Sequence, residues 1–87
     1  MKNKLTEEDI NLILEKSTIQ FETKFGKCTV CYCKLPNGFT LVESTGSVSE
    51  DNYDESIGKK VCLEHIKNEI WKLEGYSLAN ELYKANK

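Results

Sequence analysis

The clearest pattern of hydrophobic and polar positions lies in residues 27–45, where two β-rich runs flank Pro36-Asn37-Gly38. Neither face of this hairpin is strongly polar, so we expect it to be central in a sheet or covered on both sides. Proline lacks the N–H that a two-residue turn needs at this position. The sequence therefore predicts a type I turn centred on Pro36 and Asn37, with Gly38 left-handed as a G1 bulge.

The N-terminal residues predict a short helix within residues 1–17. Thr6 is a good N-cap, and Asp9 lies three residues later, where it can complete a capping box. The buried side of this helix is expected to be formed by Ile10, Ile13 and Leu14.

Strict alternation of apolar and polar residues follows in Thr18–Phe25, with Ile19, Phe21 and Phe25 on one face. This pattern is typical of a half-buried strand. Together with the hairpin it predicts a three-stranded antiparallel meander over residues 18–45. A polar, turn-rich loop is expected over residues 46–51.

Residues 52–87 return to a helical period. Asn52 is the expected N-cap of a long helix that runs to about Glu74, where Gly75 favours a stop, and a short final helix follows over Ser77–Tyr83. The buried side of the long helix is expected to consist of Ile57, Val61, Ile66, Ile70 and Leu73. The sequence thus predicts an α+β fold in a single domain of residues 1–87.

Composition restricts the classes of function. The chain has 87 residues and a net charge of −2, and all its basic residues are lysines, so we expect no DNA binding. No apolar run approaches a membrane span, and the first residues do not form a signal-peptide core, so we expect a cytoplasmic protein without membrane contact. A core of this size leaves a small stability surplus, which favours homo-oligomerisation.

Cys28, Cys31, Cys62 and His65 have the spacing of a zinc site, C-x2-C followed by C-x2-H. However, two strand-forming residues separate Cys28 from Cys31, and in an extended strand these cysteines point to opposite faces. Small apolar fillers on strands and on a helix explain the cysteines better than a metal does. We therefore expect neither a metal nor another cofactor.

Catalytic apparatus is not evident in the sequence. Nucleophilic catalysis by cysteine needs an adjacent base and a third group that orients it, and His65 is the single histidine. The chain contains no G-x-S-x-G, P-loop or G-x-G-x-x-G motif. We therefore expect a binding protein and not an enzyme.

The remaining candidate is a pocket for an anion or nucleotide, where the loop over residues 46–51 leads into the long helix. Hydroxyl and amide groups would supply polar contacts, aromatic rings would supply stacking surfaces, and lysines would neutralise phosphate. The candidate ligand-binding residues are Lys24, Lys27, Asn37, Phe39, Ser44, Thr45, Asn52 and Tyr53, with Lys34 as a further possible charge. Each has a structural alternative, because such aromatic residues often lie in a core and such lysines at a solvated edge.

The segments FGKCTVCYCKLPNGFTLVES and NYDESIG…CLEHIKNEIWKLEGY closely resemble a family of short phage and prophage proteins. The family's hallmarks are an LPNGF hairpin, an NYDE-type helix start and a W-x-LEGY close. The resemblance covers roughly Phe25–Leu82. The family includes the Thoeris anti-defence sponges.

This resemblance implies a counter-defence protein that captures a cyclic nucleotide immune signal without cleaving it. The signal would be a cyclic ADP-ribose isomer or a cyclic oligonucleotide, held in pockets between the protomers of a homo-oligomer. Family sponges use arginine for phosphate contacts, whereas this chain has none. The alternative is a small module that binds and inhibits a host defence or regulatory protein.

Overall fold

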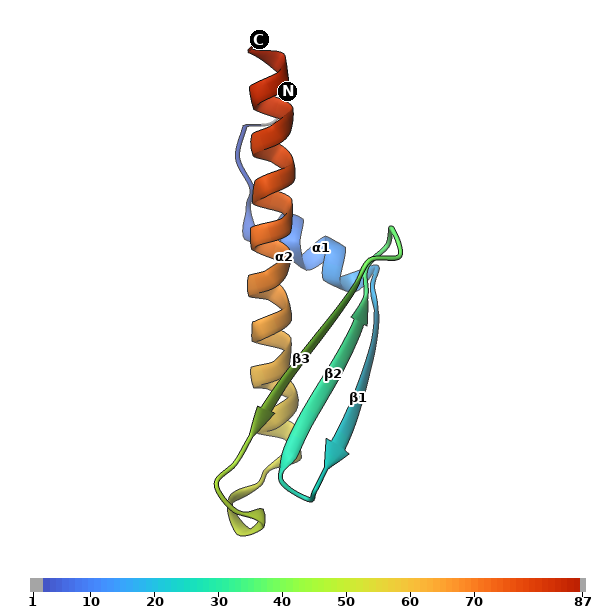
Figure 1. Ribbon diagram of the computed structural model, residues 1–87, viewed down its shortest axis with the longest axis vertical. Helices are drawn as coiled ribbons and strands as arrows, with labels where there is room; N and C mark the ends of the chain where they lie inside the picture. The colour runs from blue at the N-terminus through green and yellow to red at the C-terminus, as the bar shows by residue number, and fades with distance from the viewer. Residues whose placement is uncertain (1–2, 87) are drawn as a thin grey trace.

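A long helix packs on one face of a small sheet and projects well beyond it (Figure 1). The computed structural model describes residues 3–86, so residues 1–2 and 87 of the first and last predicted segments lie outside the described part. The elements are α1 (Glu7–Glu15), β1 (Thr18–Lys24), β2 (Cys28–Lys34), β3 (Thr40–Gly46), the 3-10 helix η1 (Glu50–Asn52) and α2 (Glu55–Ala85). The strands form one antiparallel sheet in the order β1-β2-β3. The predicted α+β architecture is confirmed.

Helix α1 begins as the sequence predicts. The Thr6 hydroxyl accepts the Asp9 N–H at 3.2 Å, and the Asp9 carboxylate accepts the Thr6 N–H at 2.9 Å, which completes a capping box. Ile10 is fully buried, and Ile13 and Leu14 pack against the core. The cap therefore sets where α1 begins, and its apolar side attaches it to the rest of the molecule.

The turn between β2 and β3 also has the predicted geometry. The Gly38 N–H donates to the Leu35 carbonyl at 2.8 Å, and the Leu35 N–H donates to the Phe39 carbonyl at 2.8 Å. Gly38 has a φ of 94°, which glycine adopts without the penalty that a Cβ would bring. The side chain of Asn37 accepts the Phe39 N–H at 3.0 Å and tightens the turn further.

Phe25 does not lie on the strand face predicted for it. Strand β1 ends at Lys24, and Phe25 and Gly26 form the turn to β2 with φ values of 56° and 65°. Phe25 is 82% exposed, whereas Ile19 and Phe21 pack against the core. Apolar alternation alone does not separate the last strand residue from the first residue of a turn.

The core lies between the inner face of β2 and one side of α2. Its buried apolar members are Ile10, Cys31, Cys33, Leu35, Cys62, Ile66 and Ile70. The hairpin was expected to be central or covered on both sides, and this holds for β2 alone. Strand β3 is an edge strand, and the helices cover only one face of the sheet (Figure 1). Within residues 3–86, no helix combines the length and apolar character needed to cross a membrane.

Helix α2 corrects two predictions about the C-terminal segment. It runs without interruption from Glu55 to Ala85 through Gly75, so there is no separate terminal helix. A glycine lowers the stability of a helix by roughly 1 kcal/mol relative to alanine. The hydrogen-bonded helical turns on both sides of Gly75 outweigh this loss. The N-cap is Asp54, because Asn52 belongs to η1.

The buried side of α2 is also rotated from the prediction. Gly58, Cys62, Ile66 and Ile70 are its buried residues. Ile57 is 60% exposed and Leu73 is 38% exposed. The buried row of helix residues begins with the small residues Gly58 and Cys62, and these allow the closest approach of α2 to the sheet.

Gly58 is the point of closest approach between α2 and β2. A Cβ built at this position would lie 3.0 Å from the Thr29 Cβ and would overlap the Thr29 hydroxyl oxygen. Thr29 is 1% exposed and lies on the central strand, between β1 and β3, so it has little room to move. Glycine is therefore required for the helix to lie at this height above the strand.

We predict that Gly58→Ala lowers the free energy of unfolding by about 1–3 kcal/mol, the usual cost of overpacking a core. Gly75→Ala, in the same helix, is the matched control. A Cβ at Gly75 meets nothing within 4 Å, so this change should stabilise the protein by about 0.5–1 kcal/mol through helix propensity. Urea denaturation of both variants measures the difference, and equal effects would refute the proposed contact.

Candidate functional site

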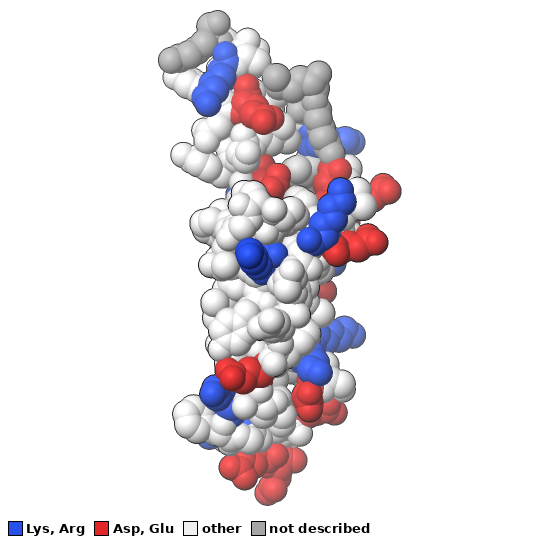
Figure 2. All heavy atoms as spheres, turned by 90° about the vertical axis from the view of Figure 1, so that its right-hand side faces the viewer, with Lys and Arg blue, Asp and Glu red and all other residues white. Residues whose placement is uncertain are grey.

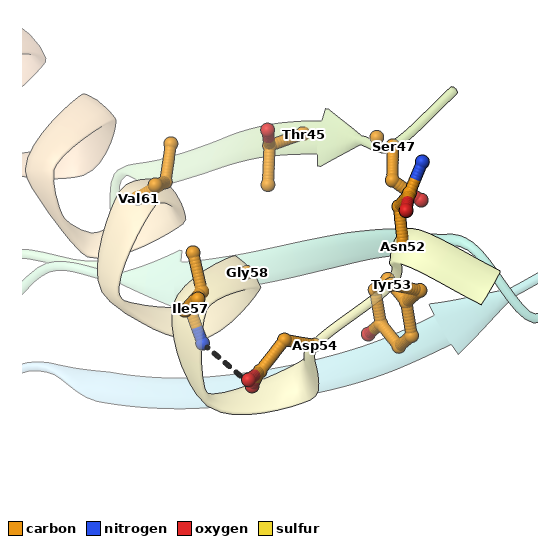
Figure 3. A pocket seen from close by; sticks show the side chains of 9 residues that line it. Thr45, Ser47, Asn52, Tyr53, Asp54, Ile57, Gly58 and Val61 are labelled. Carbon is orange, nitrogen blue, oxygen red and sulfur yellow. Dashed lines mark hydrogen bonds between the residues drawn. The ribbon is translucent and has the colours of Figure 1, made fainter. Parts of the chain in front are cut away.

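A cavity of about 100 Å³ lies where the end of β3 meets the start of α2. Thr45 and Ser47 lie on one side, Asn52 and Tyr53 come from η1 and the residue after it, and Ile57 and Val61 project from α2 (Figure 3). Gly46, Asp54 and Gly58 complete the lining. The walls thus combine hydroxyl and amide groups with an aromatic ring and two aliphatic side chains.

Tyr53 is held by the sheet. Its hydroxyl forms a hydrogen bond of 2.7 Å with the Thr29 hydroxyl and one of 3.0 Å with the Thr23 hydroxyl. These bonds satisfy the buried Thr29 side chain, and no buried side-chain nitrogen or oxygen within residues 3–86 lacks a partner. The ring that lines the cavity is therefore fixed in position before any ligand arrives.

Asp54 closes the start of α2. Its carboxylate accepts the backbone N–H of Ser56 at 2.9 Å and that of Ile57 at 3.3 Å, and it accepts the Ser56 hydroxyl at 2.7 Å; the bond to Ile57 is dashed in Figure 3. These bonds, led by the one from the Ser56 hydroxyl, lower the pKa of the Asp54 carboxyl. Two helix N–H groups that could have received an anion are thus already paired with a carboxylate of the protein.

The loop before η1 is tied to the start of β2. The Ser47 N–H donates to the Lys27 carbonyl at 2.9 Å. The Ser47 hydroxyl lies within hydrogen-bonding distance of the Ser49 carbonyl at 2.8 Å and of the Lys27 carbonyl at 3.3 Å. These bonds place Ser47 on the cavity wall and bring the backbone of Lys27 beside it.

The structure brings together part of the predicted site. Thr45, Asn52 and Tyr53 line the cavity, and Lys27 lies on the adjacent turn. Lys24 stands at the end of β1, where it forms an ion pair with Glu22 at 3.5 Å.

The other predicted residues lie elsewhere. Ser44 is exposed on the face of the sheet that the helices leave open, because neighbours on a strand alternate between faces. Asn37 and Phe39 belong to the turn at the far end of the hairpin, about 20 Å away along the strands. Phe39 is 53% exposed there, so it is not a core residue.

Sequence reasoning missed the wall that α2 contributes. Asp54, Ile57, Gly58 and Val61 recur at helical spacing and therefore share one side of the helix. The sequence-based prediction did not use this spacing, because it took Asn52 as the N-cap and so placed the start of the helix two residues too early. With Asp54 as the cap, the first turns of α2 present these residues to the cavity.

The cysteines do not assemble into a metal site. Cys31 and Cys33 are buried on the inner face of β2, whereas Cys28 lies on the opposite face of the strand. Within the described residues, no group of three or more histidine, cysteine, aspartate or glutamate side chains is placed to hold a metal ion. The four cysteines are free thiols.

Burial disfavours ionisation of the buried thiols. Burial, followed by the influence of the neighbouring Cys62, raises the pKa of the Cys31 thiol to about 12. Burial also raises the pKa of the Cys33 and Cys62 thiols. Since the thiolate is the nucleophile and the metal ligand, these groups stay protonated near neutral pH and act as core packing.

Fold and cavity together define a small α+β protein with a cavity of mixed polar and apolar lining between its sheet and its long helix. The chain belongs to the phage protein (N4 Gp49/phage Sf6 gene 66) family, whose model matches residues 5–82. The predicted relation to a phage protein family is thus confirmed. No match was found among curated proteins or among solved structures.

We predict that Tyr53→Phe lowers the free energy of unfolding by about 1–3 kcal/mol, because it leaves the buried Thr29 hydroxyl without this partner. Tyr32→Phe is the matched control, since the Tyr32 hydroxyl donates to Glu22 at the exposed surface and its loss should hardly change the melting temperature. Thermal denaturation followed by circular dichroism compares the two. A Tyr53→Phe variant as stable as the control would contradict the anchoring role of Tyr53.

The lowered pKa of Asp54 predicts a pH dependence of stability. The stabilising contribution of the carboxylate is complete above the unfolded-state pKa of roughly 3.9 and is lost as the pH falls through the lower folded-state pKa. Asp54→Asn keeps an N-cap oxygen but removes the titration. Its free energy of unfolding, measured by urea titration, should therefore fall less steeply than that of the wild type as the pH drops below about 4. Parallel curves for the two proteins would exclude this role.

Proposed function

We propose that this phage protein is a counter-defence protein that binds and sequesters a cyclic nucleotide immune signal. The ligand is a cyclic ADP-ribose isomer or a cyclic oligonucleotide, and it is released unaltered. One observation carries the proposal: the NYDE segment, a hallmark of the family that includes the anti-defence sponges, forms part of the cavity wall. It supplies Asn52, Tyr53 and Asp54 to that wall, and the Tyr53 hydroxyl bonds to Thr29 of the hairpin segment.

The chemistry of the cavity walls supports recognition of a nucleoside. The Tyr53 ring offers an aromatic surface, and Ile57 and Val61 offer an apolar wall. The Thr45 hydroxyl and the Asn52 amide can exchange hydrogen bonds with ribose or with a base edge. No hydrogen bond within residues 3–86 occupies the Asn52 side chain, so we take its amide to be available to a ligand.

The size of the cavity supports a site completed by a second copy of the chain. Ligand pockets usually enclose about 300–1,000 Å³, and this cavity of about 100 Å³ holds only part of a nucleotide. Ile57 lines it and is still 60% exposed. A homo-oligomer would cover this apolar surface and enlarge the enclosure. Its lysines, including Lys27 on the turn beside the cavity, would replace the arginine that this chain lacks.

The state of the nearby reactive groups supports the proposal of binding without cleavage. The Asp54 carboxylate is engaged by the start of α2, and the raised pKa values of Cys31 and Cys62 keep both thiols protonated. Neither is poised as a base or a nucleophile. The proposal is therefore a sequestering protein and not an enzyme.

A second candidate function is inhibition of a host defence or regulatory protein by direct binding. Exposed large apolar side chains on the helices favour it: Tyr76 is 72% exposed, Tyr83 is 65% exposed and Leu12 is 48% exposed. Such side chains are typical anchors of protein interfaces. A stable hetero-complex whose formation is indifferent to nucleotides would support this alternative.

Calorimetric and thermal-shift titrations with cyclic ADP-ribose isomers and cyclic di- and trinucleotides test the proposed function. A ligand at about 100 times its Kd should add ~2.7 kcal/mol to the free energy of unfolding. Mass spectrometry of ligand recovered after heating should find it intact, and light scattering should find more than one chain per complex. Absence of binding by every ligand would refute sequestration, and altered ligand would identify an enzyme.

Neighbouring residues on β3 provide a matched pair of variants. We predict that Thr45→Val, which keeps the shape of the cavity wall, weakens binding about fivefold, as expected for one lost hydrogen bond of ~1 kcal/mol. Ser44→Ala changes the adjacent residue on the open face of the sheet and should leave the affinity unchanged. If calorimetry finds the same loss for both variants, the cavity is not the ligand site.

A further inference from the structure

The sheet has an open face, which we call the outer face, opposite the one that packs on α2. The register of the strands arranges its residues in four rows of three: Thr18, Lys34 and Thr40; Gln20, Tyr32 and Val42; Glu22, Val30 and Ser44; Lys24, Cys28 and Gly46. Seen from the side on which the sheet lies, an uncharged area lies just below the middle of the molecule, with charged side chains around it (Figure 2).

A hollow of about 370 Å³ lies on the outer face at the end nearest the β2–β3 turn. It is several times larger than the cavity beside α2 and falls within the range of small-molecule sites. Its outer-face lining consists of the first two rows: Thr18, Gln20, Tyr32, Lys34, Thr40 and Val42. The polar groups of this hollow are hydroxyls, one amide and one ammonium.

The orientation of Tyr32 accounts for the space. Gln20 is its partner in the register, but the Tyr32 hydroxyl donates to Glu22 at 2.9 Å, one row further along β1. The ring therefore leans diagonally across the sheet, away from Lys34 and Thr40. Tyr32 is 39% exposed and Val42 is 58% exposed, so the two present an aromatic and an aliphatic surface to the hollow.

The charges on the outer face are distributed unequally. At one end, Lys24 is paired with Glu22 at 3.5 Å. At the other end, Lys34 forms no ion pair within the described part of the chain. The hollow thus has one uncompensated positive charge beside an aromatic ring that is held in place by a hydrogen bond.

The outer face is too small to be a protein interface by itself. Seven-residue strands extend about 23 Å, and three strands side by side cover about 10–15 Å. The resulting area of roughly 350 Å² is less than half of the ~800 Å² that each partner buries in a stable complex. A small ligand matches these dimensions better.

We propose that the hollow on the outer face binds a small aromatic anion. The planar ring of the ligand stacks on Tyr32 and contacts Val42, its polar edge bonds with the Gln20 amide, and its negative group lies on the Lys34 ammonium. A nucleoside monophosphate and an aromatic carboxylate share this chemistry. The inference stands apart from the proposed function, because the hollow lies on the opposite face and at the opposite end of the sheet from the cavity beside α2.

Titration of the 15N-labelled full chain with adenosine monophosphate, followed by amide chemical shifts, tests the proposal. The expected result is saturable shifts in the first two rows of the outer face. Adenosine has the aromatic ring without the phosphate, and ribose 5-phosphate has the phosphate without the ring. Both should bind more weakly than adenosine monophosphate. Indole-3-acetate should bind if the hollow accepts aromatic anions in general, and it should not bind if the hollow is specific for nucleotides. Either result supports the proposal.

Matched variants test the two contacts. Tyr32→Val keeps strand propensity and should weaken binding of adenosine monophosphate about tenfold through lost stacking. Lys34→Gln should weaken it about three- to fivefold and reduce its salt dependence. Lys24→Gln, at the opposite end of the same face, is the control and should leave the affinity unchanged.

Three outcomes would overturn the proposal. The first is the absence of shifts up to millimolar concentrations of either anion. The second is a set of shifts confined to residues 45–58, which would place the anion in the cavity beside α2 and would support the proposed function instead. The third is shifts of the outer-face residues that follow protein concentration without ligand, which would show a second copy of the chain on this face.

Discussion

The contact between Gly58 of α2 and Thr29 of β2 determines how the rest of the molecule is arranged. A side chain at Gly58 would collide with Thr29, so glycine sets the height of the helix above the sheet. The Thr29 hydroxyl then bonds to Tyr53 at 2.7 Å, and the Cys62 thiol donates to the Thr29 carbonyl at 3.3 Å. The helix, the sheet and the segment between them thus all contact one buried residue, Thr29.

The cavity beside α2 is a consequence of this contact. Because the helix starts so close to β2, the chain between β3 and α2 must turn within a few residues. Asp54 caps the helix at that turn, and Tyr53 reaches back into the sheet. The residues of the NYDE segment therefore serve the fold and form the cavity wall at the same time. One short motif thus defines both the start of the helix and a wall of the cavity.

A second consequence is that the two faces of the sheet have different chemistry. The inner face carries small thiols and a threonine that allow close packing of α2, and burial keeps those thiols protonated. The outer face has no covering element, so Tyr32 and Val42 remain exposed there. In a chain of 87 residues the helices available cover one side only. The two binding sites proposed for this protein accordingly lie at the margin of the core and on the open face of the sheet.

The sequence alone determined the elements whose signals are local. The cap formed by Thr6 and Asp9, the turn over residues 36–38 and the alternation in the three strands all follow from side-chain chemistry within a few residues. The resemblance of the linked motifs correctly pointed to a phage protein family. It did not locate a site, because residues such as Asn37 and Asn52 carry similar amide groups at opposite ends of the sheet.

Only the tertiary structure decided which features lie together. Gly75 read as a helix stop but lies within α2, because local propensity of about 1 kcal/mol yields to the turns on either side. Gly58, which helix propensity alone disfavours, is the position where the helix touches the sheet. Ile57 was assigned to the core from its spacing, yet the packing turned it outward. Periodicity specifies that a helix has an apolar side, whereas the shape of the opposing strand selects the row of residues that becomes buried.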